Sequence, residues 1–386
     1  MGTFTGQLNA NEIFASLYNM IISMEIYSDN IEGDDLVDKA RVEGSLYGDT
    51  KLYYSTDALY SSEWGNDAEA TNLLQVKRPK APECQAIRLD VFRQIEVTVD
   101  NYLSKRAWID EGAFTTFNSV ILGWLGDTKK IYDGTTYNVY IGTTISSAPI
   151  NTVLVDLNAD SNSAGENLGL AVANVLSKLN SYSRKYNDYG HIRKYAKSRI
   201  KVVWNSKYLN AVKKIDLPSI FHNEELETAF VGDDMVEDYW GTVITASNIS
   251  TYSASTPTTG KPINSTTHAY TPGTNNANGT IRAVKEKTVT ISDVVYHVFP
   301  GEEIPSGATI VASTGNFLPG EVYIEQDDLI AKMYIKLPPY MSAFQVGTSF
   351  FNPKALNETH YLTFGHNTIE YLKNYPFLTL KVKPSA

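Results

Sequence analysis

The sequence predicts an α+β fold, in which two long helices stand among many strands. Apolar residues recur at helical spacing in 110–126 and again in 164–186. Apolar and polar residues alternate in 88–99 and in 377–382, as they do in strands with one buried face. From residue 281 onward, short strand-like runs are separated by turns that contain glycine.

Composition limits the classes of protein that fit. With 386 residues, 42% hydrophobic and 20% charged, the chain can form one large domain or two ordinary ones. Its net charge of −10 disfavours strong non-specific binding to nucleic-acid phosphates, although a protein could still enclose nucleic acid without gripping it. The single cysteine, Cys84, excludes an intrachain disulfide and fits a reducing compartment.

Tyrosine is unusually frequent, with 25 residues against 14 Phe and 5 Trp. A tyrosine combines a large apolar ring with a polar hydroxyl, which suits contacts between subunits. Tyrosine also fills β-strands well. Composition alone leaves both interpretations open.

The N-terminal region contains little regular periodicity. Residues 1–10 resemble a mobile polar arm, and a helix capped by Asn11 is expected over 11–25. Residues 29–85 are rich in glycine, acids and tyrosine and show no long apolar period. An unstructured loop of this length is unusual in a compact domain. We therefore expect either disorder or an extended excursion that a neighbouring subunit stabilises.

The most strongly patterned helix follows the strand at 88–99. Asp110 is placed as its N-cap, and Gly126 is expected to end it. Its bulky apolar residues are expected to face the core, and they are Phe114, Phe117, Ile121, Trp124 and Leu125. The run 131–144 then reads as a β-hairpin around Asp133-Gly134.

The second half begins with a capping-box sequence at Ser163 that starts the helix 164–186. A buried strand is expected at 199–204, and Asn205 is placed as the cap of a short helix over 207–214. Residues 246–280 are rich in Ser, Thr, Asn, Gly and Pro, so a surface loop or insertion is expected there. Strands are expected at 288–291, 294–298, 309–312 and 377–382.

One segment weakly resembles a calcium-binding loop. Asp156, Asn158 and Asp160 have the alternating spacing that places oxygen ligands around Ca²⁺. Ser161 stands where such a loop needs Gly, and Asn167 stands where it needs Glu. A polar turn before the next helix therefore explains the segment better, and no metal site is assigned.

No catalytic constellation emerges from the sequence. It contains neither a P-loop nor a nucleophile elbow. His360 and His366 are six residues apart, which suits neither a helical nor a zinc-finger metal site. Adjacent acids such as Asp233-Asp234 are interpreted as solvated surface. We therefore expect no catalytic residue, no cofactor and no enzymatic activity.

The order of these parts and three short sequence segments resemble those of a known protein family. The segments are Ser104–Ala107 before the patterned helix, Val202–Ser206, and Ser349–Pro353 through Leu362. They resemble the major capsid proteins of tailed bacteriophages, which have the Hong Kong 97-type fold. These segments are most similar to those of capsid proteins from small short-tailed phages. The resemblance in the order of parts covers most of the chain.

The resemblance implies a division of the chain. It assigns 1–30 to an N-terminal arm, 31–86 to an extended E-loop, and 87–150 to a P-domain with a spine helix at about 110–126. The A-domain would span 151–345 and include the insertion 246–280, and 346–386 would return to the P-domain with a terminal strand. No crosslinking pair is identified.

The resemblance also implies a function. The protein would self-assemble into hexamers and pentamers of an icosahedral shell that encloses double-stranded DNA. Portal proteins, with scaffolding or decoration proteins, would be its other partners, and no membrane would be involved. The shell would form in the bacterial host cytoplasm, and the protein would reside in the virion.

Two other classes of function remain open. A β-rich carbohydrate-binding or adhesive protein would use residues 246–345, with Tyr and Trp as sugar platforms. A hydrolase would use carboxylates on loops, but no acidic residue is distinguished from the others. Assembly state separates these alternatives from a shell protein.

Overall fold

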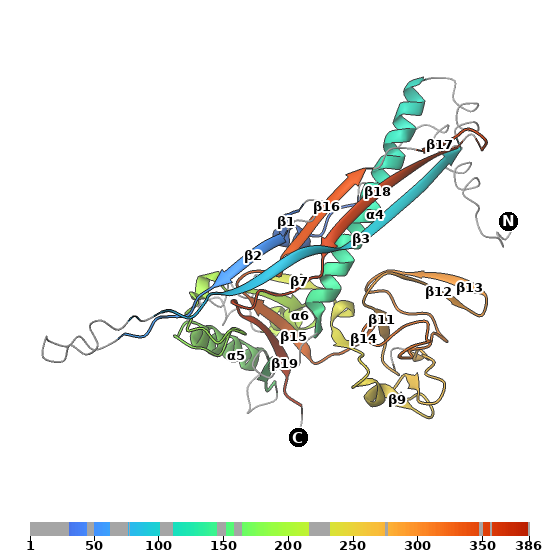
Figure 1. Cartoon of the computed structure of the whole chain (residues 1–386). Helices are drawn as coiled ribbons and strands as arrows, with labels where there is room; N and C mark the ends of the chain where they lie inside the picture. Colours follow the sequence, from blue (N-terminus) through green and yellow to red (C-terminus); the bar gives the residue numbers. More distant parts are fainter. Residues whose placement is uncertain are drawn as a thin grey trace, which may run out of the picture.

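The computed structural model describes residues 31–44, 50–61, 76, 78–100, 111–144, 152–157, 164–215, 232–274, 277–346, 350–355 and 357–384. A long helix and a long strand ladder run side by side through an elongated body, and a β-hairpin projects from it (Figure 1). A sheet covered by helix α5 lies beneath the root of this hairpin, and a smaller β unit lies on the other side of the lower end of α4.

The long ladder belongs to a sheet with strand order β1-β16-β18-β3-β2, and β17 pairs with β18. β3 and β18 are antiparallel, from Leu89 opposite Asn367 to Asp100 opposite Asn357. The strand predicted at 88–99 is confirmed, and it begins earlier than expected. The bounds are β1 Arg41–Glu43, β2 Thr50–Ser55, β3 Glu83–Asp100, β16 Tyr340–Val346, β17 Phe350–Asn352 and β18 Asn357–Asn367.

Helix α4 (Glu111–Gly142) packs against this sheet and has 32 residues. The predicted end at Gly126 and the predicted hairpin around Asp133-Gly134 are therefore wrong. The strand-like residues Tyr137 and Ile141 are fully buried in the helix, and their burial outweighs their local β preference. Asp110, the expected N-cap, lies outside the described residues.

The apolar stripe expected to face the core is only partly buried. Leu125 is 3% exposed, as predicted, whereas Trp124 is 48% exposed. Tyr132 is buried on the side of the helix that carries Leu125, whereas Ile141 is buried on the opposite side, in the core shared with α2. The predicted core role of Trp124 is thus wrong. The side chains of Phe114, Phe117 and Ile121 lie outside the described residues.

A second sheet has the strand order β5-β19-β15-β6-β7 and is packed against helix α5. The predicted strand 377–382 is confirmed as β19, and the predicted cap is confirmed because Asn205 Oδ1 accepts from Lys207 N at 3.1 Å. The helix expected to reach 186 ends at Leu179. The bounds are β5 Thr152–Val155, α5 Ala164–Leu179, η3 Lys197–Arg199, β6 Lys201–Asn205, α6 Ser206–Ile215, β7 Asp233–Met235, β15 Leu329–Tyr334 and β19 Phe377–Val382.

Residues 246–280 belong to a folded β unit and not to a loose surface loop. Ile263 and Tyr270 are buried in its core, and the Tyr270 hydroxyl donates to Glu303 Oε1 at 2.7 Å. These distant contacts supply the core that local composition concealed. The bounds are β4 Thr143–Thr144, η4 Glu237–Tyr239, β8 Gly241–Val243, η5 Ile249–Tyr252, β9 Ser253–Ala254, β10 Ile263–Asn264, β11 Ile281–Ala283, β12 Lys287–Ile291, β13 Val294–Val298 and β14 Val322–Glu325.

The turns of this unit follow the sequence prediction. Gly301, Gly307 and Gly320 have φ angles of +85°, +83° and +93°, which glycine adopts without the strain of a side chain. The strands predicted at 288–291 and 294–298 are confirmed as β12 and β13. The strand predicted at 309–312 is wrong, because that segment makes only isolated bridges, such as Ile310 with Phe317.

The start of the predicted excursion packs on its own subunit. Helix α2 (Asp35–Ala40) buries Leu36 and Val37 in the core shared with α4. Asp34 caps it, accepting from Leu36 N at 2.8 Å, and Asn138 Nδ2 donates to Asp34 at 2.5 Å. The expectation that this whole segment needs a neighbour is therefore wrong for its first part. The helix predicted at 11–25 lies outside the described residues.

Candidate assembly surfaces

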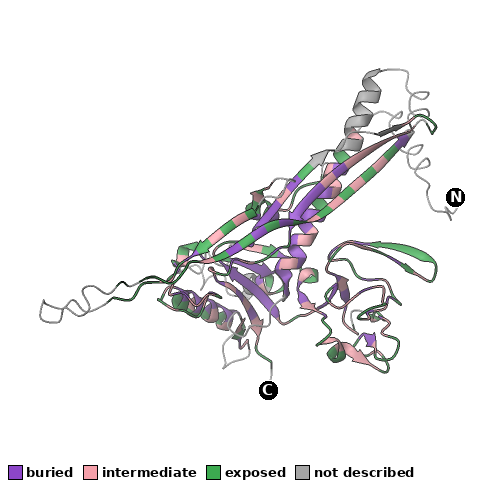
Figure 2. Ribbon diagram, in the orientation of Figure 1, coloured by how far each residue is buried: buried purple, intermediate pink, exposed green. Residues whose placement is uncertain are grey.

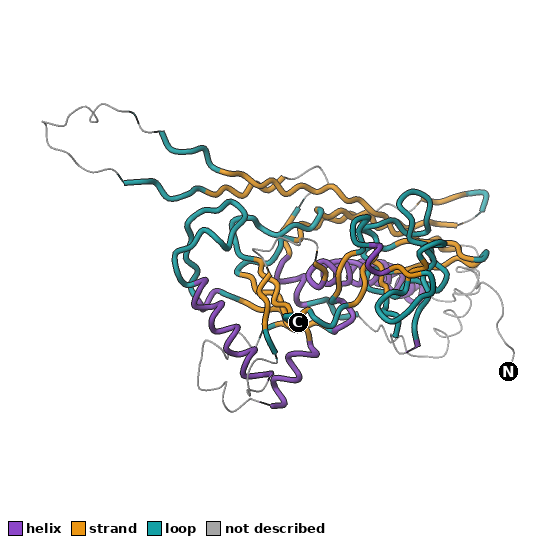
Figure 3. The backbone as a smooth tube through the Cα atoms, turned by 90° about the horizontal axis from the view of Figure 1, so that it is seen from below, coloured by secondary structure: helices purple, strands orange, loops and turns teal. Residues whose placement is uncertain are grey.

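One strand joins the projecting hairpin to the body. β3 has 18 residues and is about 60 Å long. Its first part pairs with β2, from Glu83 opposite Ser55 to Arg88 opposite Thr50. From Leu89 onward it pairs with β18. The hairpin extends well beyond the rest of the molecule in both views (Figures 1 and 3), so its direction is set by the central sheet.

The hairpin carries large apolar side chains that a single subunit does not cover. Leu59 is 77% exposed and Tyr60 is 88% exposed. Tyr54 and Val76 are also exposed. We call these four residues the arm surface. Exposed apolar groups gathered on a projecting element are typical of a protein–protein contact.

Side chains from distant loops fix the base of the hairpin. Ser55 Oγ donates to Asn374 Oδ1 at 2.7 Å and lies 2.8 Å from His191 Nδ1. Asp57 accepts from Arg184 at 2.6 Å and from Ile192 N at 3.0 Å. The hydrogen bond from Arg184 is the main reason that the pKa of Asp57 lies well below its usual range. The hairpin therefore leaves the body in a defined direction.

A second exposed apolar surface lies on α4. Trp124 and Ile131 are exposed and seven residues apart, so they share one face of the helix. Asp133, on the opposite side, and Tyr132, about a quarter turn away from Trp124 and Ile131, are buried against the sheet. We call Trp124 and Ile131 the spine surface. Within the single subunit both side chains are open to contact by another molecule.

Beneath the spine surface, buried polar groups hold α4 on the sheet. The Lys129 ammonium donates to Asp133, and both side chains are buried. The Tyr340 hydroxyl donates to Asp133 Oδ1 at 2.7 Å, and Arg41 lies 3.7 Å from the other oxygen. Burial raises the pKa of Tyr340 far above its usual value. The carboxylate of Asp133 thus links three segments of the chain. Figure 2 shows the buried residues concentrated where α4 meets the sheet.

His366 belongs to the same interior. Its Nε2 lies 2.9 Å from the Tyr132 hydroxyl, and its Nδ1 lies 2.8 Å from Asn367 O. The carbonyl can only accept, so Nδ1 carries the proton and Nε2 accepts from Tyr132. Burial lowers the pKa of His366, which favours this neutral form. Both ring nitrogens therefore have structural partners.

Of the three weak calcium candidates, Asp156 is the one within the described residues. Asp156 forms an ion pair with Lys383 at 3.1 Å. Asn158 and Asp160 lie outside the described residues, so the expectation of no metal site at this weak calcium candidate stays a prediction. Across the described ranges, no three His, Cys, Asp or Glu side chains form a metal-binding group. Cys84 is exposed on β3.

Sequence reasoning missed other residues with unusual environments. Lys332 is buried on β15, and Asp133 is buried on α4. A lysine in a strand and an Asp-Gly pair in a helix carry no local signal of burial. No helix within the described ranges combines the length and apolar character that a bilayer crossing requires.

Solved structures with a similar fold come from bacteriophage particles. A chain in the capsid structure of Staphylococcus phage Andhra is 12% identical, with a TM-score of 0.54, and the match covers 93% of this chain and 84% of that one. A chain in the structure of the head fiber and inner core protein gp22 of native bacteriophage P68 is 14% identical, with a TM-score of 0.56 and coverage of 93% and 88%.

No protein-family model matches the sequence, and no curated protein matches it. At these identities, the likeness concerns the fold. It confirms the predicted α+β fold and is consistent with the Hong Kong 97-type architecture. The chain therefore shares its fold with chains in these two bacteriophage structures.

Proposed function

We propose that this chain is a major capsid protein that self-assembles into the icosahedral shell of a tailed bacteriophage. The observation that carries the proposal is the fold shared over 93% of the chain with a chain of the phage Andhra capsid structure. A long body with a projecting arm suits a subunit that must reach its neighbours in a shell. Such a protein acts through contacts and not as an enzyme.

We assign the parts of the chain to roles in that shell. Residues 1–30 form the N-terminal arm and 31–86 the E-loop, whose base is the β2–β3 hairpin. The P-domain begins at 87 and contains α4 as its spine helix. The A-domain spans 151–345, including the β unit that contains 246–280, and 346–386 returns to the P-domain. The terminal strand β19 lies beside β15 in the sheet covered by α5.

Contacts between copies supply the assembly energy in this proposal. The arm surface offers exposed Leu59 and Tyr60 to a neighbouring copy, and the spine surface offers Trp124. Burying an exposed apolar side chain of this size contributes about 1.5–3 kcal/mol. Many such contacts, each of them weak, can together stabilise hexamers and pentamers, while a misplaced subunit can still dissociate and bind again.

The charge of the chain fits enclosure of DNA without tight binding. A net charge of −10 repels phosphates on average, so packaged double-stranded DNA can move along the inner wall. We further propose that the protein resides in the virion after assembly in the host cytoplasm. Portal, scaffolding or decoration proteins would be its other partners.

Negative-stain electron microscopy of the purified chain tests the proposal. We expect closed or partial shells, or rings of five or six subunits, at high protein concentration. A glycan array on the same sample is expected to show no binding. A strictly monomeric protein under all assembly conditions would refute a shell function, and glycan binding would favour the adhesive alternative.

A further inference from the structure

A cavity of about 600 Å³ lies between α4, β15, β19 and the segment that follows β18. Its walls are mainly apolar, and they include the aromatic rings of Tyr140, Tyr371 and Phe377. Tyr371 and Phe377 stack with their ring centroids 5.7 Å apart. The volume lies within the range of small-molecule sites, which are concave, apolar and furnished with a few polar groups.

Lys332 supplies a polar group in this cavity. It is 3% exposed, and its Nζ donates to Thr143 O at 2.7 Å. The Nζ also lies 5.3 Å from the centroid of the Phe377 ring. Thr143 directly follows α4, so the ammonium sits at the negative end of the helix dipole. No acidic side chain in the described part of the chain forms an ion pair with it.

This environment leaves the charge of Lys332 poorly compensated. Burial lowers its pKa to about 7, because removing the ammonium from water disfavours the charged form. A carbonyl and an aromatic ring are weaker partners for an ammonium than a carboxylate is. An anion that enters the cavity would supply the missing partner.

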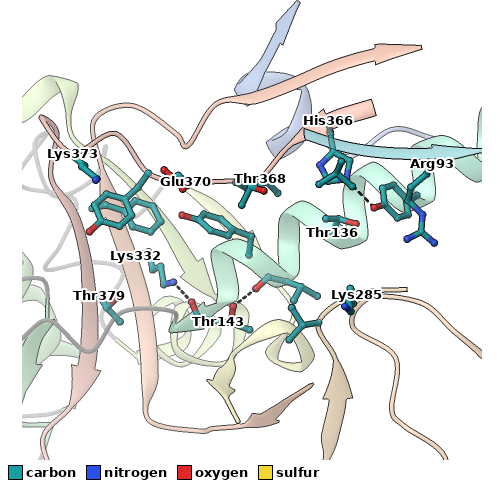
Figure 4. A pocket seen from close by; sticks show the side chains of 18 residues that line it. Arg93, Thr136, Thr143, Lys285, Lys332, His366, Thr368, Glu370, Lys373 and Thr379 are labelled. Carbon is teal, nitrogen blue, oxygen red and sulfur yellow. Dashed lines mark hydrogen bonds between the residues drawn. The ribbon is translucent and has the colours of Figure 1, made fainter. Parts of the chain in front are cut away.

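The other charged groups of the cavity also favour an anion. Basic side chains outnumber acidic ones: Figure 4 shows Lys332 and Lys373 toward one end and Arg93 and Lys285 toward the other, with Glu370 as the acidic residue in the lining. Arg93 and Lys285 have carboxylate partners outside the lining, Glu286 at 2.6 Å and Glu321 at 2.7 Å. Lys373 is exposed, so Lys332 is the buried basic group best placed for a ligand.

We propose that this cavity binds a small carboxylate with a flat apolar body. The carboxylate would pair with Lys332, and the apolar body would lie among Tyr140, Tyr371 and Phe377. This binding is a property of the single subunit. It can therefore be tested whether or not the protein forms shells.

The test compares two probes that differ mainly in charge. 2-Naphthoate and its neutral analogue 2-naphthamide are titrated into the purified full-length chain at pH 6.5, and affinities are measured by calorimetry. We expect 2-naphthoate to bind roughly tenfold more tightly, as one charge-assisted hydrogen bond would provide. Lys332→Met keeps the length and apolar stem of the side chain and should abolish that preference. Lys354→Met, an exposed control, should retain it.

A second measurement covers the case in which Lys332→Met fails to fold. Dilute acylating reagent is applied to the wild-type chain, and modification of Lys332 is quantified by mass spectrometry. 2-Naphthoate should slow that modification, whereas 2-naphthamide should have a smaller effect. Equal affinity for both probes, a preference retained in Lys332→Met, or binding without protection of Lys332 would each overturn the proposal.

Discussion

At the scale of single residues, two buried charges behave in opposite ways. Asp133 is surrounded by Lys129, Tyr340 and Arg41, so its charge is shared among donors. Lys332 has a carbonyl oxygen and an aromatic ring instead. The first charge is therefore a structural link between elements, and the second is a local cost to stability that a ligand could relieve.

Removing the Asp133 charge tests the first description. Asp133→Asn leaves the Lys129 ammonium buried without its counter-ion and should lower the free energy of unfolding by about 3–5 kcal/mol. The control is Asp127→Asn, which breaks the more exposed pair of Asp127 with Lys130 on the same helix and should cost under about 1 kcal/mol. Urea denaturation measures both. Similar losses in the two variants would contradict the role of Asp133.

The buried lysine predicts a pH dependence of stability. The pKa of Lys332 falls from 10.5 to about 7 on folding. Between those values the unfolded chain holds a proton that the folded chain lacks, so this residue makes stability rise with pH by about 1.4 kcal/mol per unit. Below pH 7 its destabilising effect is fully present. Lys332→Met should remove this rise in urea melts between pH 7 and 9, while Lys354→Met should keep it.

At the scale of elements, α4 has two faces with different tasks. One face packs on the sheet through Leu125 and Tyr132, and near the end of the helix Ile141 is buried on the opposite side, in the core shared with α2. The other presents Trp124 and Ile131 to the surroundings of a single subunit. A helix of 32 residues is about 48 Å long, so it can support the sheet and also offer contacts to another copy.

Substitutions on the two faces should separate folding from assembly. Ile141→Ala opens a cavity in the core and should cost about 2–5 kcal/mol of unfolding free energy. Trp124→Ala should cost about 1 kcal/mol, less than Ile141→Ala, because about half of this residue is already exposed in the single subunit. Its effect should instead appear as fewer assembled particles by electron microscopy. A large loss of stability in Trp124→Ala would show that this side chain acts as a core residue and would contradict its role as a contact surface.

At the scale of the whole molecule, the projecting β2–β3 hairpin and the body are joined by one continuous sheet. β3 pairs with β2 in the arm and with β18 in the body. The junction is held because Ser55 donates to Asn374 and Asp57 accepts from Ile192 N, both on distant loops. A neighbour that binds this hairpin would therefore act directly on the central sheet.

Polar substitutions on the arm surface test this arrangement. The double variant Leu59→Ser/Tyr60→Ser should fold normally, because both side chains are exposed, and it should lose assembly. Val295→Ser removes an exposed apolar group from the β12–β13 hairpin and serves as the control. Particle counts by electron microscopy are read beside urea melts. An equal loss of particles in the control would contradict a specific role for the arm.

The sequence by itself determined the elements whose signals are local. Strand 377–382 follows from alternation, and the cap of α6 follows from Asn205. The turns at Gly301 and Gly320 follow from backbone angles that glycine adopts readily. The order of these parts was enough to indicate the fold class, because each signal depends on residues close together in the chain.

Only the tertiary structure decided which local preferences were overruled. Asp133-Gly134 is a hairpin signal, yet it lies inside α4 because Lys129 and Tyr340 hydrogen-bond to Asp133 and Asp34 packs against Gly134. Trp124 is a large aromatic residue of the kind often found in a core. It is about half exposed, because the sheet packs against a different face of the helix. These outcomes depend on burial between segments far apart in sequence, which no local pattern records.

The same reason explains the interior of the β unit and the cavity. Ile263 and Tyr270 lie in a stretch of polar composition, and they are buried only because strands from residue 281 onward enclose them. Lys332 reads as a polar position in a strand, and its burial arises where α4, β15 and β19 meet. Sequence thus determined the elements and their order, while packing between distant elements decided which side chains are core, which are contact surface and which line a cavity.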